Sequence, residues 1–165
     1  MIKNRFLNKN DFNELKDLFI KEKNNLNYYK KIGWTESGIL SQLIKKNNHS
    51  IGLFTFSRLI GFIIGNLYTV DKFSEYEILL LYICKKYRKK GYASDLLNLI
   101  TGTHYKSSLN QVTLEVSENN IEAINLYIKN KFIEVGKRNK YYYIGNNTRE
   151  NALIFKKNIN KINDN

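Results

Sequence analysis

Residues 82–100 read YICKKYRKKGYASDLLNLI. Three consecutive cations, Arg88, Lys89 and Lys90, follow an apolar run and precede Gly91, after which apolar residues recur at helical spacing. This order predicts a strand, a glycine-containing loop and a helix. Because a helix N-terminus presents unpaired backbone N–H groups and the positive end of the helix dipole, such a loop can hold a phosphate. A solvent-exposed turn is the alternative, since many strand-to-helix turns contain a glycine.

Length and cysteine content restrict the class of protein. With 165 residues, the chain can form one domain with a sizeable core, and we expect this domain over residues 1–158, followed by a polar C-terminal tail at 159–165. Cys84 is the only cysteine, which excludes a disulfide framework and favours a reducing compartment. No signal-like start and no apolar run near ~20 residues is present. These features predict a cytoplasmic protein with no membrane partner.

The formal net charge of +12 raises the question of a nucleic-acid partner. Most of the cations are lysines, and they are dispersed along the chain beside abundant Asn, Ile and Tyr, as expected from A/T-rich coding. A dispersed lysine surface favours solubility over a binding footprint. We therefore expect no direct nucleic-acid binding, while an RNA-rich or ribosomal neighbourhood stays open.

Hydrophobic periodicity predicts the order of the elements. The first strand is expected at 2–7 and helices at 10–20 and 35–46. Asp11 and Glu14 are predicted at the N-cap and N3 positions of the first helix, and Thr35 at the N-cap of the second. The buried stripes are predicted to contain Phe12, Leu15, Leu18 and Phe19 in the first helix and Ile39, Leu40, Leu43 and Ile44 in the second.

The rest of the chain is predicted as strands at 51–57, 59–70 and 75–84, a helix at 91–105, a strand at 111–116, a helix at 119–130 and strands at 131–143 and 151–158. The first three of these strands are expected to form an antiparallel meander. The order β-α-α-β-β-β-α-β-α-β-β predicts a single-domain α/β fold, with a mixed central sheet flanked by helices and βαβ crossovers in its second half.

Three segments resemble one family. RKKGYA, residues 88–93, is similar to the R/Q-x-x-G-x-G/A acetyl-CoA loop of the GCN5-related N-acetyltransferases (GNAT), and no Walker-type loop is present. Residues 114–143, LEVSENNIEAINLYIKNKFIEVGKRNKYYY, resemble the RimI-type branch, which acetylates protein N-termini, and GWTESGILSQL at 33–43 resembles its P-W-S/T-E segment. This chain departs from the pattern at Gly33, at Lys85 and at Asn130-Lys131, where the family has Pro, Pro and Leu-Gly.

The resemblance implies a GNAT-like fold and acetyl-CoA as the cofactor, with CoA as a product. It implies that the pyrophosphate lies on the amides of residues 89–94. The small side chain of Ala93 keeps the first helical turn free of bulk. The cofactor-binding residues carried over are Leu81, Tyr82, Ile83, Arg88, Lys89, Lys90, Gly91, Tyr92, Ala93, Ser94 and Asn120. The first three would act through their backbone groups.

Glu115 is the candidate general base. Alternation in VTLEV puts Val112, Leu114 and Val116 on one strand face and Glu115 on the other, so that its carboxylate can face a cleft. Periodicity alone favours an ordinary exposed glutamate. The resemblance implies instead that Glu115 draws a proton from the incoming ammonium, directly or through one water.

Tyr127 is the candidate general acid, which the resemblance implies would protonate the departing thiolate. Its helix is predicted to be capped by Asn119 with Glu122 at N3. A core tyrosine is the alternative. Tyr141 and Tyr142 match tyrosines that hold the substrate's peptide backbone in this branch, although a YYY run also suits a plain strand. Trp34 either lines the substrate mouth or packs the second helix.

Neither a cysteine nucleophile nor a metal site is expected. Only His49 and His104 could activate Cys84, and neither lies near it in sequence, so a buried small hydrophobe is the simpler role. One cysteine and two separated histidines provide no ligand spacing for a metal.

Two classes of function therefore remain. The first is an acetyl-CoA-dependent N-acetyltransferase acting in a ternary complex, either on the N-terminal α-amine of a protein such as a ribosomal protein, or on a small amine (polyamine, amino acid) or lysine side chain. An α-amine has a pKa of about 7.7–8.0, against about 10.4 for lysine, so that a single glutamate suffices for it. The second class is a non-catalytic basic RNA- or ribosome-binding module. We expect a monomer or homodimer in either case.

Overall fold

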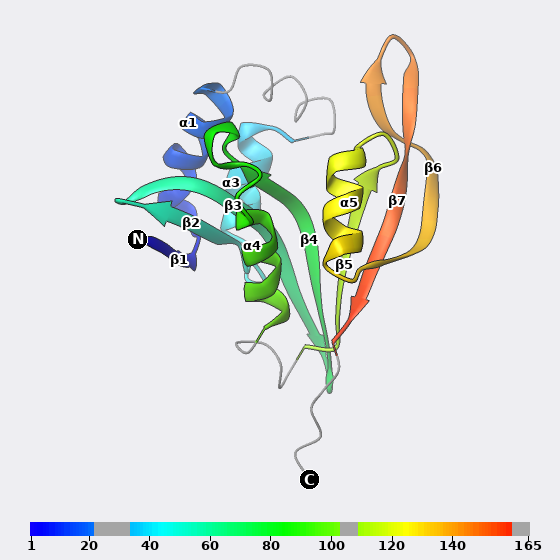
Figure 1. Cartoon of the computed structure of the whole chain (residues 1–165), viewed down its shortest axis with the longest axis horizontal. Helices are drawn as coiled ribbons and strands as arrows, with labels where there is room; N and C mark the ends of the chain where they lie inside the picture. Colours follow the sequence, from blue (N-terminus) through cyan, green and yellow to red (C-terminus); the bar gives the residue numbers. More distant parts are fainter. Residues whose placement is uncertain (22–33, 103–108, 160–165) are drawn as a thin grey trace.

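The computed structural model describes residues 1–21, 34–102 and 109–159, and the side chains of 19–21 are not among those described. Seven strands form one mixed sheet in the order β1-β2-β3-β4-β5-β7-β6. Helices α1 and α3 cover one face and α4 and α5 the other (Figure 1). The α/β fold and the element order predicted from the sequence are confirmed. Residues 160–165 of the tail predicted at 159–165, as well as Gly33 and His104, lie outside the described residues.

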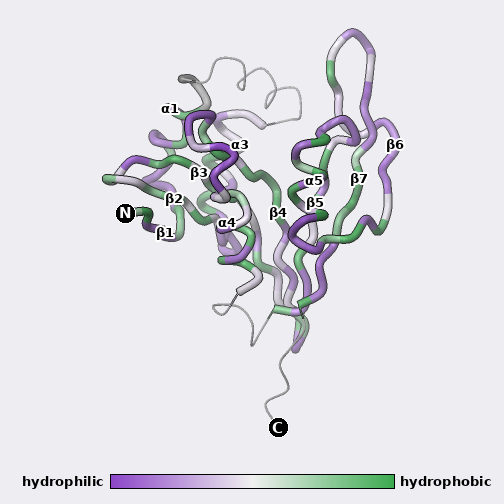
Figure 2. The backbone as a smooth tube through the Cα atoms, in the orientation of Figure 1, coloured by the Kyte–Doolittle hydropathy of each residue, from purple (hydrophilic) through white to green (hydrophobic). Residues whose placement is uncertain are grey.

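The N-terminal half of the sheet contains the antiparallel meander predicted for three strands, with β1 added at its edge. β1 (Ile2–Phe6), β2 (Ile51–Thr55), β3 (Arg58–Val70) and β4 (Phe73–Ile83) pair in sequence order. β3 and β4 lie in the middle of the sheet, and their apolar side chains contribute to the hydrophobic cores on both faces. Figure 2 shows hydrophobic residues along these strands beneath the helices, whereas the outer part of the last hairpin is hydrophilic.

The C-terminal half completes the sheet. β5 (Gln111–Ser117) pairs with β7 (Thr148–Asn158), and β7 pairs with the edge strand β6 (Ile133–Gly145), both antiparallel. Asn146 and Asn147 make the turn between β6 and β7 with φ of 50° and 56°. Asparagine tolerates this left-handed backbone, which suits a two-residue hairpin.

β4 and β5 separate in the middle of the sheet. They pair in parallel only from Glu75 with Gln111 to Ile78 with Leu114, after which the strands diverge (Figure 1). A bulge at this point leaves Leu79 without a partner on β3, because Gly65 pairs with Ile78 and Ile64 with Leu80. Bulges bend a strand and increase its twist. The opening between β4 and β5 follows from this bend.

Two hydrophobic cores lie on the two faces of the sheet. α1 (Phe12–Lys21) and α3 (Glu36–Leu43) cover the first, and α4 (Tyr92–Thr101) and α5 (Ile121–Lys129) cover the second. The bulge in β4 changes the face to which alternate residues point. Ile78, before the bulge, lies in the α4–α5 core, and Leu80, after it, lies in the α1–α3 core. Within the described part of the chain, none of the helices has both the length and the apolar character needed to cross a bilayer.

The helix caps differ from those predicted. Asn8, not Asp11, begins the first helical segment, and it forms a capping box with Asp11 at N3 of the 3₁₀ turn η1 (Lys9–Asp11). Glu14 instead accepts a hydrogen bond from the Leu59 N–H at 2.5 Å. At α5, the cap is Asn120 and not Asn119, with the Asn120 side chain accepting from the Ala123 N–H at 3.2 Å. Thr35 caps α3 as predicted.

The predicted apolar stripe of α3 is only half correct. Ile39 and Leu43 are buried, whereas Leu40 is 37% exposed and Ile44 is 63% exposed. The reason is that α3 ends at Leu43 and that the sheet beneath its last turn is polar. Gln42 is buried there and donates to Asn66 of β3. α4 likewise ends at Thr101, before the predicted end at residue 105.

Candidate active site

The loop before α4 has the geometry that an anion site needs. After the 3₁₀ turn η2 (Lys85–Tyr87), Lys89 has a φ of 58° and Gly91 a φ of 90°. Gly91 is the N-cap of α4, and no side chain caps this helix end. The first-turn N–H groups of Tyr92, Ala93 and Ser94 therefore point to the helix end, where the dipole favours negative charge.

Two of the three exposed cations of this loop, Arg88 and Lys90, contact neighbouring groups of the protein. Arg88 donates from Nε to the Ile83 carbonyl at 2.9 Å, and its guanidinium lies 5.5 Å from the centroid of the Tyr82 ring. The Lys90 ammonium lies 5.8 Å from the Tyr87 ring centroid. A Cβ placed on Gly91 would meet nothing within 4 Å, so the space over the loop is open. The residues present thus fit a phosphate group on the backbone of the loop.

A cleft of about 120 Å³ occupies the opening between β4 and β5. It is lined by Ile78–Leu81 of β4, by the end of β5 from Glu115 to Ser117, and by residues of α5. It brings together five of the residues singled out from the sequence, which are Leu81, Glu115, Asn120, Tyr127 and Tyr142. An extended strand edge on one side and a carboxylate on the other can hold an acyl group beside a base.

Glu115 projects from the side of β5 opposite the α4–α5 core. Val112, Leu114 and Val116 are buried in that core, as the alternation predicted. The Glu115 side chain is 27% exposed and forms an ion pair with Arg138, whose Nε lies 3.0 Å from Oε1. The Arg138 guanidinium also lies 5.2 Å from the centroid of the Tyr141 ring. Glu115 is therefore held in place by neighbours on β6.

Tyr141 completes this group. Burial raises the pKa of the Tyr141 phenol, and the charge and hydrogen bond of Glu115 raise this pKa further, while Arg138 acts in the opposite direction. Tyr141 is 43% exposed and its ring packs edge-on against Tyr142, with ring centroids 5.0 Å apart. A substrate that reaches Glu115 from this side of the sheet would meet both tyrosines.

Tyr127 lies in the wall of the cleft and is only 6% exposed. Its ring packs against Phe132 and Phe155 with centroid distances of 5.7 and 6.2 Å. The end of α5 fixes its backbone: the Phe132 N–H donates to the Tyr127 carbonyl at 3.0 Å and the Lys131 N–H to the Ile128 carbonyl at 2.9 Å. This is a Schellman ending with its hydrophobic contact. Core packing and a position on the cleft thus coexist at Tyr127.

The remaining predicted residues lie in different places. Tyr82 is buried in the α1–α3 core, so only its backbone can face a cofactor. Trp34 is half-buried and packs against the same core, outside the cleft. Asn120 caps α5 with its side chain and also lines the cleft. Ser94 accepts a hydrogen bond from Asn130 Nδ2 at 3.1 Å, which ties the first turn of α4 to the end of α5.

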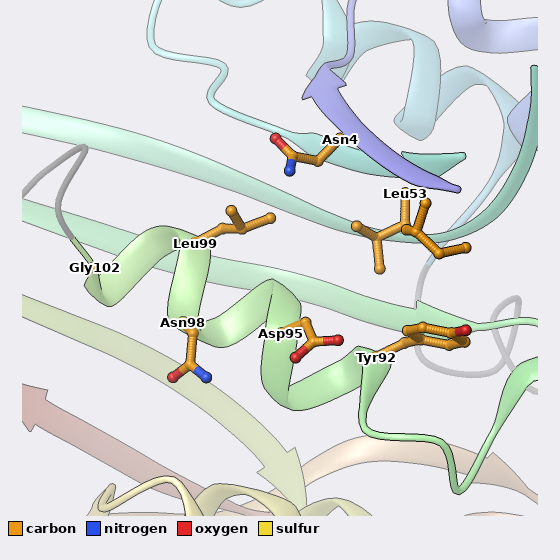
Figure 3. Close-up of a pocket in the computed structure, with 8 residues that line it drawn as sticks. Asn4, Leu53, Tyr92, Asp95, Asn98, Leu99 and Gly102 are labelled. Atoms are coloured by element: carbon orange, nitrogen blue, oxygen red, sulfur yellow. The ribbon is translucent and has the colours of Figure 1, made fainter. Parts of the chain in front are cut away.

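A second, larger hollow of about 420 Å³ lies between α4 and the strands β1 and β2 (Figure 3). Leu99 points from α4 toward these strands (Figure 3), and Asn4, Asp95 and Asn98 are the polar residues among those that line the hollow. Of the predicted site residues only Tyr92 reaches it. The splayed strand edge and the Glu115 carboxylate held by Arg138 are both at the smaller cleft.

Arg138 and Asn130 were not identified from the sequence. Arg138 stands in the stretch that resembles the RimI-type branch, yet no spacing rule connects it with Glu115. Asn130 replaces a residue of the family pattern, and the only signal was this departure. The bulge at Leu79 has no sequence signal, since it lies within a continuous apolar run.

A sheet that opens beside a helix N-terminus without a side-chain cap, with a carboxylate on the opened strand, can hold an anion and an acyl group beside a base. The profile of the Acetyltransferase (GNAT) family matches residues 12–132, and the chain belongs to this family. Members of the family use acetyl-CoA to acetylate amines, so the chain is an acetyl-CoA-dependent N-acetyltransferase. This answers the choice between an enzyme and a non-catalytic basic module.

Several solved structures share the fold. The ribosomal-protein-S18-alanine N-acetyltransferase from Escherichia coli has a TM-score of 0.78 at 21% identity, covering 100% of this chain and 98% of that one. Arabidopsis thaliana NAA60 in complex with a bisubstrate analogue has a TM-score of 0.78 at 21% identity, over 98% and 99% of the two chains. A spermidine N-acetyltransferase SpeG chimera from Vibrio cholerae and hSSAT has a TM-score of 0.72 at 16% identity, covering 95% of each chain. A search of curated protein sequences finds no match.

Proposed function

We propose that this enzyme acetylates the N-terminal α-amine of a protein, such as a ribosomal protein, by direct attack of the amine on the thioester in a ternary complex. The observation that carries the proposal is the Glu115 carboxylate, held by Arg138 and Tyr141 at the edge of the cleft. The acetyltransferase from Escherichia coli and NAA60 with its bisubstrate analogue support it as relatives in fold. A cytoplasmic location is part of the same proposal.

Each residue has a defined task in this reaction. Glu115 accepts a proton from the incoming ammonium, directly or through one water, which leaves a neutral amine. The amine nitrogen bonds to the acetyl carbon as the carbon–sulfur bond breaks, and Tyr127 gives its proton to the departing thiolate. The acylated nitrogen then loses its second proton, which returns through solvent to the Tyr127 phenolate. The backbone of Leu81 to Ile83 holds the acyl group, and the amides of residues 89–94 hold the pyrophosphate. Acetyl-CoA supplies the activated acetyl group.

A small amine or a lysine side chain is the second candidate acceptor, and one observation favours it. Glu75 and Glu77 lie on the same sheet face as Glu115, because Glu77 is paired with Thr113 and Glu75 accepts a hydrogen bond from the Thr113 hydroxyl. Among the described residues, neither carboxylate forms an ion pair with a cation. An acceptor with a second positive charge would therefore find complementary charge on this face.

The choice of acceptor is tested with a panel of N-terminal peptides, free lysine and polyamines, acetylated with acetyl-CoA at two ionic strengths. We expect the highest kcat/KM for an α-amine. For a basic peptide, kcat/KM should rise with added salt, because the net charge of +12 repels it. Preference for a polyamine or a lysine side chain over every α-amine would overturn the N-terminal proposal and leave the family assignment intact.

The catalytic roles are tested by removing one proton carrier at a time. Glu115→Gln and Tyr127→Phe should each lower kcat by about 10²- to 10⁴-fold, the usual contribution of a general base or acid. The affinity for acetyl-CoA, measured by calorimetry, should be nearly unchanged. Glu134→Gln and Tyr143→Phe, at exposed positions of β6, are matched controls. Unchanged rates in folded Glu115→Gln or Tyr127→Phe, checked by circular dichroism, would refute the assigned role.

A further inference from the structure

We propose that Asn151 is a positioning residue that fixes a bulge in β6 and thereby holds Arg138 and Tyr141 against Glu115. The inference rests on the proposed function, because it assigns Glu115 the role of base. Asn151 lies on β7, outside the cleft, and none of the sequence patterns indicated a role for it.

The bulge is visible in the pairing of β6 with β7. Arg138 pairs with Ala152 and Tyr142 with Glu150, so that residues 139–141 of β6 face the single residue Asn151 of β7. In an unbroken strand, residues three apart point to opposite faces. Here Arg138 and Tyr141 meet on one face, with the guanidinium 5.2 Å from the ring centroid. The bulge is therefore what allows both side chains to reach Glu115.

Asn151 supplies the hydrogen bond that the broken ladder lacks. Its Oδ1 accepts from the Lys140 N–H at 2.8 Å. Lys140 lies at the centre of the bulge with a φ of 53°, a conformation that a lysine adopts only when its surroundings hold it there. The side-chain amide of Asn151 thus stands in for a backbone carbonyl.

Glu118 fixes the orientation of this amide. Its Oε1 accepts from Asn151 Nδ2 at 2.5 Å and from the Asn151 N–H at 3.3 Å, and its own N–H donates to the Asn151 carbonyl at 3.1 Å. Lys137 donates to Oε2 at 2.7 Å. These bonds hold the pKa of Glu118 at about 2, so that it remains an acceptor at working pH. Nδ2 must then face Glu118, and Oδ1 must face Lys140.

Loss of the Asn151 side-chain amide should therefore weaken binding of the amine substrate and leave binding of acetyl-CoA unchanged. We expect Asn151→Ala to raise the KM for the acceptor on the order of tenfold, the size of one lost positioning hydrogen bond, with a smaller effect on kcat. The affinity for acetyl-CoA should not change, because its predicted phosphate site lies on α4. Asn158→Ala, an exposed asparagine on the same strand, is the matched control.

An exchange of the two partners gives a rescue test. Asn151→Asp keeps the acceptor for Lys140 but sets a second carboxylate against Glu118, so it should raise the acceptor KM as Asn151→Ala does. The double variant Glu118→Gln with Asn151→Asp restores a donor opposite an acceptor, and we expect the KM to return to within about threefold of the wild-type value. A merely structural role would not follow this reversal of donor and acceptor.

The pKa of Tyr141, followed by NMR of ring-labelled tyrosine, is a readout that does not depend on activity. In the wild type it should lie above the ordinary value of 10.0, owing to burial and to Glu115, and Arg138 is the other charged group acting on it. In Asn151→Ala it should fall toward that value. If Asn151→Ala and Asn151→Asp leave both this pKa and the acceptor KM at the values of Asn158→Ala, the inference is wrong. The kinetic arm uses whichever amine the wild type acetylates best, so failure of the N-terminal proposal is seen separately.

Discussion

At the scale of single residues, Gly91 shows most directly how sequence determines the loop that we propose as the phosphate site. Its φ of 90° belongs to the left-handed side of conformational space, and a side chain there would project into open space over the loop. Glycine is thus required by the backbone, and the absence of a side chain leaves the helix amides accessible. The two effects can be separated by substitution.

Gly91→Glu should abolish binding of CoA, because the carboxylate would occupy and repel the phosphate position. Gly91→Ala should cost about 1–2 kcal/mol of folding free energy through backbone strain, but retain measurable CoA binding, since a methyl group leaves the space open. Calorimetric titration with CoA at up to millimolar concentration distinguishes the two variants. Tight binding of CoA by folded Gly91→Glu would place the phosphate elsewhere.

The orientation of a single side chain was predicted correctly where strand alternation alone determines it. The prediction failed where two adjacent residues could both take the same role. The outward orientation of Glu115 follows from strict alternation in β5, and the structure has it so. Asn119 and Asn120 are equally good caps by composition, and the choice depends on the hydrogen bond from the Asn120 N–H to the Ser117 carbonyl. Arg138 could not be predicted as the partner of Glu115, because its facing depends on the β6 bulge.

At the scale of elements, the end of α5 carries strain that one substitution can relieve. Lys131 occupies the C′ position of the Schellman ending with a φ of 65°, where glycine is the usual residue. Lys131→Gly should increase the free energy of unfolding by up to about 1 kcal/mol, since relief of about 1–2 kcal/mol of left-handed strain exceeds the added chain entropy of glycine, about 0.5–1 kcal/mol. Urea denaturation measures this difference.

The charge of Lys131 requires a separate control. Burial lowers the pKa of Lys157, and the nearby Lys131 lowers it further, so removing the Lys131 charge is itself favourable. Lys131→Ala removes the charge without freeing the backbone. If Lys131→Ala stabilises as much as Lys131→Gly, the charge and not the backbone explains the gain.

The elements themselves were largely predictable, while their ends were not. Strands and helices followed from long apolar repeats, and each predicted element has its counterpart among the described residues. α3 was predicted too long because Leu40 and Ile44 continue the apolar repeat. In the structure, the polar side chain of Asn66 lies under the last turn of α3, so that Gln42 is the residue buried there. Asn66 belongs to a strand distant in sequence, so local periodicity could not reveal this packing.

At the scale of the whole molecule, the opening of the sheet depends on a single irregularity in its middle. β4 is buried on both faces, and its apolar run gives no sign that Leu79 is displaced from the ladder. The position of the bend depends on how the strand packs against two cores, one on each face of the sheet. The family pattern predicts a cofactor loop and a base, yet the cleft at Glu115 arises from long-range packing.

Two carboxylates link the stability of the whole fold to pH. Burial alone would raise the pKa of Asp11, but hydrogen bonds from Arg5 and from the Asn8 N–H outweigh it and hold this pKa below its usual range. Arg5 contacts both carboxylate oxygens, at 3.0 and 2.6 Å, which fastens β1 to the start of α1. Hydrogen bonds from Lys137 and Asn151 lower the pKa of Glu118 from 4.5 to about 2.

Because both pKa values are depressed in the folded state, the stabilisation is complete above the ordinary values of 3.8 for Asp11 and 4.5 for Glu118 and is lost as the pH falls through the folded values. We expect the free energy of unfolding, from urea denaturation, to decrease from pH 5 to pH 2. Asp11→Asn and Glu118→Gln should each be less stable than the wild type at pH 5, and the difference should shrink as the pH approaches 2, where the wild type loses the same interactions. Asp71→Asn, in the turn between β3 and β4, is the control. A difference between wild type and Glu118→Gln that is equally large at pH 5 and pH 2 would contradict the assignment, since a protonated carboxyl can no longer hold Lys137 and Asn151 as an anion does.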